Sequence, residues 1–137
     1  MARKHRTVTA TIDQAKVRRR AAEAYLDVAE LVLAEKGQTA MPSVAAGLAV
    51  LAGIASSDAI CARRLGQIHR GDDHRAAAAL LGQAVPDGNK LASTFLRLVD
   101  LKDEAHYGLV IVPASKARNA VRWAQQLVTR AQEELER

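Results

Sequence analysis

One long apolar segment most constrains what this chain can fold into. It runs from Val44 to Leu65, VAAGLAVLAGIASSDAICARRL, and carries no charge before Asp58. Its side chains are mostly small, and small side chains let neighbouring helices approach closely. We therefore expect the central helix of an all-α bundle. The uncharged run within it, residues 41–57, is shorter than the ~20 residues of a membrane span and rich in Ala and Gly, which argues against a transmembrane helix.

A single acid interrupts the apolar face of this helix. Helical spacing places one set of side chains on a shared face: Leu51, Ile54, Asp58, Cys61 and Leu65. A buried carboxylate is costly unless it is paired, so Asp58 needs a partner such as a His, an Arg or a Tyr hydroxyl. Two interpretations follow: a structural ion pair or bond to Ser57, or a carboxylate that orients a polar site.

Composition favours one helical domain. The chain has 137 residues, abundant Ala and only 3% aromatic residues, so strand-forming residue types are scarce. The single cysteine, Cys61, excludes an internal disulfide and fits a reducing cytoplasm. The basic start is not followed by the apolar core of a signal peptide, so we expect a cytoplasmic protein that does not bind membranes.

The net charge of +5 is concentrated near the N-terminus. We expect a basic arm over residues 1–10 and a bundle domain over residues 11–137. The arm and the start of the first helix could contact nucleic-acid phosphates, or could form a solvated tail that binds nothing. The candidate phosphate-binding residues are Arg3, Lys4, Arg6, Arg18, Arg19 and Arg20.

Capping and turn residues divide the chain into five helices. Thr11 and Gln14 form a capping box, Asp72 or Asp73 caps the third helix, and Asp87 starts the fourth. The expected helices are Ile12 to Lys36, Val44 to Leu65, Ala76 to Val85, Asp87 to about His106, and one beginning at 113–115. An extended connection over Leu109 to Val112 precedes the last helix. The acids Glu133, Glu134 and Glu136 lie at the wrong end for the helix dipole, which predicts fraying there.

Local motifs for catalysis or metal binding are almost absent. The sequence contains no phosphate loop, CxxC, HExxH or nucleophile elbow. Asp103 and His106 have the spacing of a bundle metal site, but such a site needs several carboxylates on facing helices. We therefore expect no metal and no cofactor.

Four segments together resemble the HEPN family of helical nucleotide- and RNA-binding domains. They are AAGLAVLAGIASSDAICARRLG, GDDHRAAAALL, LKDEAHYG and SKARNAVRWAQQLV, and the likeness covers about residues 40 to 135. The resemblance implies an up-and-down bundle of four or five helices, often a homodimer. It also implies a polar site near the end of the penultimate long helix.

Many HEPN domains are metal-independent ribonucleases that use an Arg, a polar neighbour and a His, with four to six residues between the Arg and the His. Here Lys102 takes the place of the Arg and Asp103 that of the polar neighbour, and His106 follows after only three residues. Arg97 is too far from His106 to replace the Arg. Arg is also better than Lys at bidentate contact with phosphate. The departure argues against efficient cleavage.

These observations lead to three functional hypotheses. The first is a HEPN-like domain that dimerises and binds RNA, nucleotide or a protein partner without efficient catalysis. Its expected polar cluster is Asp58, Arg97, Lys102, Asp103, His106 and Tyr107, with His106 bonded to Asp58. The second is a toxin-like ribonuclease with His106 as general acid or base and Lys102 or Arg97 stabilising charge. The third is a purely structural dimerisation module.

Overall fold

The structure is a computed structural model that describes residues 6–37, 41–109 and 111–136. Most of the described chain is helical, with one small sheet, so the all-α prediction is confirmed. The elements, in order, are β1 (Arg6–Thr9), α1 (Ile12–Ala34), α2 (Met41–Leu65), β2 (Gln67–Arg70), α3 (His74–Ala84), α4 (Gly88–Val99), α5 (Lys102–Tyr107) and α6 (Ala114–Leu135).

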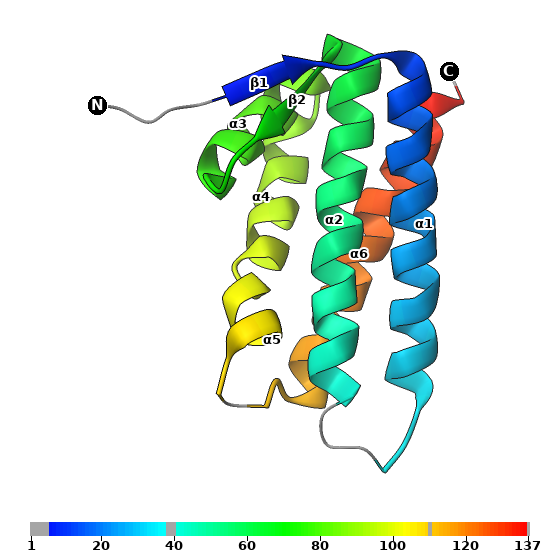
Figure 1. The fold of residues 1–137 in the computed structure, drawn as a ribbon, viewed down its shortest axis with the longest axis vertical. Coiled ribbons are helices and arrows are strands. Elements are labelled where there is room, and N and C mark those ends of the chain that lie inside the picture. Colours follow the sequence, from blue (N-terminus) through cyan, green and yellow to red (C-terminus); the bar gives the residue numbers. More distant parts are fainter. Residues whose placement is uncertain (1–5, 38–40, 110, 137) are drawn as a thin grey trace.

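Helix α2 is the centre of the bundle, as the sequence predicts. Helices α1 and α6 pack along it on one side, and α3, α4 and α5 lie on the other (Figure 1). Most of the buried residues of α2 are Ala, Gly or Ser. A Cβ at Gly53 would collide with the side chain of Leu98, so α4 depends on that glycine for its close approach to α2.

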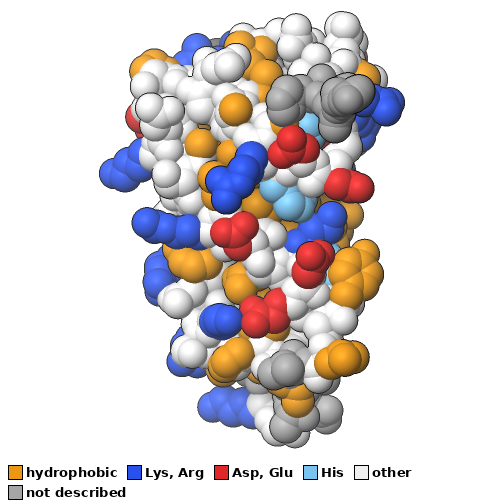
Figure 2. All heavy atoms as spheres, turned by 90° about the vertical axis from the view of Figure 1, so that its left-hand side faces the viewer, with side chains coloured by type: hydrophobic (Ala, Val, Ile, Leu, Met, Phe, Trp, Pro, Cys, Tyr) orange, Lys and Arg blue, Asp and Glu red, His pale blue; other side chains and the backbone are white. Residues whose placement is uncertain are grey.

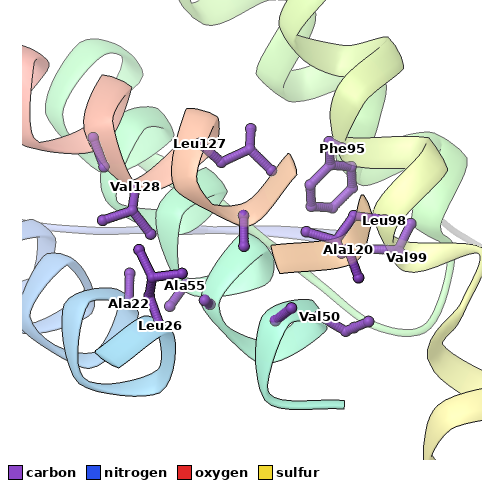
Figure 3. Close-up of a cluster of buried hydrophobic side chains, with 14 of the residues drawn as sticks. Ala22, Leu26, Val50, Ala55, Phe95, Leu98, Val99, Ala120, Leu127 and Val128 are labelled. Atoms are coloured by element: carbon purple, nitrogen blue, oxygen red, sulfur yellow. The ribbon is translucent and has the colours of Figure 1, made fainter. Parts of the chain in front are cut away.

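The core that surrounds α2 combines many alanines with larger side chains from α1, α4 and α6 (Figure 3). Phe95, Leu98 and Leu127 are almost completely buried. Helix α2 is long and apolar enough to cross a membrane, but 72% of its most apolar window is buried inside the protein. That burial is typical of a core helix.

Two short strands form a ribbon that the sequence did not predict. Strands β1 and β2 pair antiparallel, with Val8 opposite Ile68 and Arg6 opposite Arg70. The amide of Ala10 donates to the carbonyl of Gly66 at 2.9 Å, which extends the connection. Residues 6–10, assigned above to a basic arm, therefore belong to the folded unit. Arg3 and Lys4 lie outside the described residues.

The fourth predicted helix is two helices. Helix α4 ends at Val99, and α5 begins at Lys102 after a turn in which the amide of Leu101 donates to the carbonyl of Leu98. The change of direction allows α5 to pack against the N-terminal half of α2, where Ala105 and His106 lie next to Gly47. The prediction of a single helix from Asp87 to about His106 was therefore wrong.

The C-terminal turn of α6 is held by a buried acid. Glu134 is fully buried, and its two oxygens bind Nε of Arg64 at 2.7 Å and Nε of Arg130 at 2.8 Å. Arg130 also forms a bidentate pair with Asp87, at 2.7 and 2.8 Å. This pair lowers the pKa of Asp87, since Arg130 donates to its charged form. The predicted fraying at Glu134 was wrong because the ion pairs outweigh the helix dipole.

Replacing Glu134 with Ala should lower the free energy of unfolding by about 2 to 3 kcal/mol, because two guanidinium groups lose a shared buried acceptor. Partial exposure of both arginines places the expected loss below that for a fully buried pair. Urea unfolding followed by circular dichroism measures it. Glu133→Ala is the matched control on the exposed face of the same turn, with an expected change within about 0.5 kcal/mol. Equal effects of the two substitutions would contradict the assigned role of Glu134.

Candidate functional site: a basic pocket

A pocket of about 200 Å³ lies between the C-terminal half of α2 and the elements packed around it. Five of its lining residues are basic or imidazole side chains and one is an acid. Figure 2 shows the face formed by α3, α4 and α5, where histidine side chains lie among basic and acidic groups. The polar residues of this basic pocket are Arg18, Asp58, His69, Arg70, His74 and Lys102. Its apolar lining includes Ile54, Ala77, Leu80 and Phe95.

The polar side chains of the basic pocket come from five elements: α1, α2, β2, α3 and α5. Strand β2 carries His69 and Arg70, and it is bounded by Gly66 (φ 67°) and Gly71 (φ 114°). These left-handed conformations suit glycine and reverse the chain at both ends of the strand. His74 is the first residue of α3, directly after the predicted cap Asp73, whose side chain accepts from the amides at positions 75 and 76.

The buried acid of α2 is paired with an arginine from α1. Nε of Arg18 donates to Oδ2 of Asp58 at 3.0 Å, and their side chains are 34% and 15% exposed. Burial raises the pKa of Asp58, while the adjacent Arg18 guanidinium opposes that increase. Arg70 and His69 lie close enough to favour the charged carboxylate as well. Of the three partner types expected from the sequence, the arginine is the one observed.

His106 does not bind Asp58, so that part of the predicted polar cluster was wrong. Its Nε2–H donates to the carbonyl oxygen of Gly47 at 3.1 Å. Gly47 and Asp58 are eleven residues apart on α2, about 16 Å along the helix axis. The bond to Gly47 fastens α5 to the opposite half of α2 from the basic pocket.

The structure brings only part of the predicted cluster together. Lys102, the first residue of α5, lines the basic pocket with Asp58. Asp103 and Arg97 are exposed and do not line it. Tyr107 is 73% exposed and makes an edge-to-face ring contact with His106 at 5.9 Å. Asp58 and Lys102 are therefore the two members of the predicted cluster that share a site.

Among the described residues, the basic side chains near the N-terminus point in different directions and have different neighbours. Arg18 lines the pocket, Arg19 lies 3.9 Å from Glu23, and Arg20 is exposed. Successive residues of a helix point about 100° apart, which explains why three consecutive arginines take three different roles. Arg6 pairs in register with Arg70 across the ribbon, so two like charges lie opposite each other.

Sequence reasoning missed His69 and Arg70 as site residues. The signal that could have found them is the pair of glycines around QIHR together with the β-branched TVT segment near the N-terminus. The structure also places His74, half-buried, among the residues that line the pocket.

The described residues favour neither thiol chemistry at Cys61 nor metal binding. Cys61 also lines the pocket, but burial, the largest cause, raises the pKa of its thiol to about 12, so the reactive thiolate is scarce near neutral pH. No group of three or more His, Cys, Asp and Glu residues that could hold a metal ion occurs within residues 6–37, 41–109 and 111–136.

Replacing Asp58 with Asn tests the electrostatic balance at the site. Since the pKa of Asp58 is raised in the folded state, the native protein binds more protons there than the unfolded chain between pH 3.8 and that higher pKa. The stability of the native sequence relative to Asp58→Asn should therefore fall as pH rises through that window and then level off. Urea unfolding at a series of pH values measures the difference.

Asp100→Asn, at an exposed position of the turn after α4, controls for the loss of one carboxyl group. A relative stability of the native sequence that increases with pH would mean that the attraction of Arg18 exceeds the cost of burial, contrary to the assignment.

Comparison of the chain with protein-family models and with curated proteins found no match.

Proposed function

We propose that this protein binds the phosphate group of a nucleotide or of an RNA end in the basic pocket. The observation that carries the proposal is the charge around the cavity. Arg18, Arg70 and Lys102 contribute three positive charges against the single carboxylate of Asp58. Within the described part of the chain, neither Arg70 nor Lys102 forms an ion pair. The guanidinium group of Arg70 and the ammonium group of Lys102 are therefore available to an anion.

The shape and lining of the pocket favour a phosphate with an organic group attached. Ile54, Leu80 and Phe95 give the cavity an apolar wall, which inorganic phosphate alone would not use. A volume of about 200 Å³ is below the range of a typical ligand pocket, about 300 to 1,000 Å³. The cavity thus suits a phosphate and an adjoining sugar, with a base resting nearer the surface.

Arg18 is already positioned to contact such a ligand. Its pair with Asp58 uses Nε and holds the guanidinium group at the pocket wall. A guanidinium group has five N–H donors, so the terminal nitrogens can still bind a phosphate oxygen. This role for Asp58 corresponds to the orienting carboxylate that the sequence analysis considered. Binding without efficient catalysis also agrees with the departed ribonuclease motif around Lys102.

The proposal predicts saturable binding of AMP that depends on the pocket cations. Replacing Lys102 with Met keeps most of the side-chain volume and removes the charge, which should weaken AMP affinity about tenfold through loss of one charge-assisted contact. Isothermal titration calorimetry at low salt measures the affinity. Binding should also weaken as salt is added, because the attraction is between charges.

Arg97→Met is the matched control, since it removes an exposed cation of α4 that lies outside the pocket. It should leave AMP affinity unchanged. The proposal fails if AMP does not bind at low salt, or if the two substitutions weaken binding equally. Adenosine and inorganic phosphate, titrated separately, show which part of AMP provides the affinity.

Metal-independent cleavage of RNA is a second candidate function, favoured by one observation. Two imidazole groups, His69 and His74, line the same pocket as three cations, and imidazoles commonly serve as general acids and bases. Incubation of labelled RNA with the protein in EDTA tests for cleavage. Loss of cleavage in His69→Ala but not in His106→Ala would locate it in the basic pocket, and the reverse result would favour the motif around His106.

A further inference from the structure

One face of α1 is apolar along most of its length and largely exposed, with Ala21 partly buried against the core. Its residues follow one another at intervals of four, three, four and three, which is the spacing of a helix that packs against another helix. Val17, Val28 and Leu31 are 61%, 45% and 68% exposed. Helix α1 lies at the outer edge of the bundle, where it has neighbours on one side (Figure 1). We call this set of residues the α1 stripe: Val17, Ala21, Ala24, Val28 and Leu31.

Beyond Asp13 in its first turn, α1 divides its charges between its two halves. Residues 16–20 carry four basic side chains and no acid, whereas residues 23–35 carry four acidic side chains and no base. The acidic residues are Glu23, Asp27, Glu30 and Glu35. Two copies of α1 placed parallel would set like charges beside each other. Placed antiparallel, each basic half faces the partner's acidic half.

From the exposed stripe and this division of charge we infer that the protein forms a symmetric homodimer through antiparallel packing of α1 against the α1 of a second copy. A twofold axis makes the interface self-complementary, so each contact occurs twice. The 23 residues of α1 extend about 34 Å, and two helices packed over that length approach the size of a stable interface.

Charge also selects the register of the two helices. Antiparallel packing allows Val17 to lie against the partner's Val28 and Ala21 against the partner's Ala24. In that register, Arg20 at the edge of the stripe lies next to the partner's Asp27. Shifting the partner by one heptad would instead bring Asp27 against the partner's Asp27. The first register is therefore favoured, since it replaces a repulsion by two symmetric ion pairs.

Arg20 and Asp27 are suited to intermolecular pairing. Both side chains are exposed, and neither makes an ion pair with another described residue of the same chain. By contrast, Arg18 and Arg19 on the neighbouring faces of α1 have acidic neighbours within their own chain. The small side chains of Ala21 and Ala24 let the two helix backbones come close at the centre of the interface.

Charge reversal tests both the interface and its register. Arg20→Glu should weaken the dimer about tenfold or more, because it places like charges together at two symmetric positions, and Asp27→Arg should do the same. The double variant Arg20→Glu with Asp27→Arg should restore dimerisation to near the native affinity. Sedimentation equilibrium over a concentration series measures the dissociation constants.

Lys90→Glu, an exposed charge reversal on α4, is the matched control and should leave the dimer intact. Circular dichroism confirms that each variant is folded, and Val17→Glu should dissociate the dimer independently of the charge pair. A native chain that remains monomeric up to about 0.1 mM overturns the inference. A dimer that both single reversals leave unchanged overturns it as well, and failure of the double variant to recover overturns the register.

Discussion

Close packing of helices around the small side chains of α2 is the constraint on which this structure depends. Because Ala, Gly and Ser dominate the buried surface of α2, the larger residues of α4 and α6 can reach its backbone at Gly53. The same closeness at Gly47 lets an imidazole from α5 bind a helix carbonyl. A bundle built this way has little spare volume in its core.

The parts of the fold that follow from local chemistry could be predicted from the sequence. The capping box of Thr11 and Gln14, the Asp73 cap and the end of α2 at Leu65 all depend on residues within one turn of each other. The ribbon could not be predicted in the same way. Its two strands are separated by about sixty residues, and each is too short to show a periodic pattern by itself.

The partner of Asp58 in the candidate site could not be predicted from the sequence either. The sequence indicated that Asp58 needs a partner, and helical spacing alone could not decide which of several distant cations or imidazoles would supply it. Arg18 lies forty residues away and His106 forty-eight, so neither spacing nor propensity distinguishes them. The direction of α5 excludes His106, because the turn after α4 carries His106 to Gly47, whereas Lys102 at the start of α5 lines the same pocket as Asp58.

The pairing of β1 with β2 links the beginning of the described chain to the chemistry of the pocket. No residue of β1 lines the basic pocket, yet β1 supplies the backbone partners that keep β2 extended and thereby set the direction of His69 and Arg70. An isolated four-residue strand has no stable conformation of its own. A protease cut or a bulky insertion between β1 and α1 would therefore alter the basic pocket indirectly, by releasing the strand that supports one of its walls.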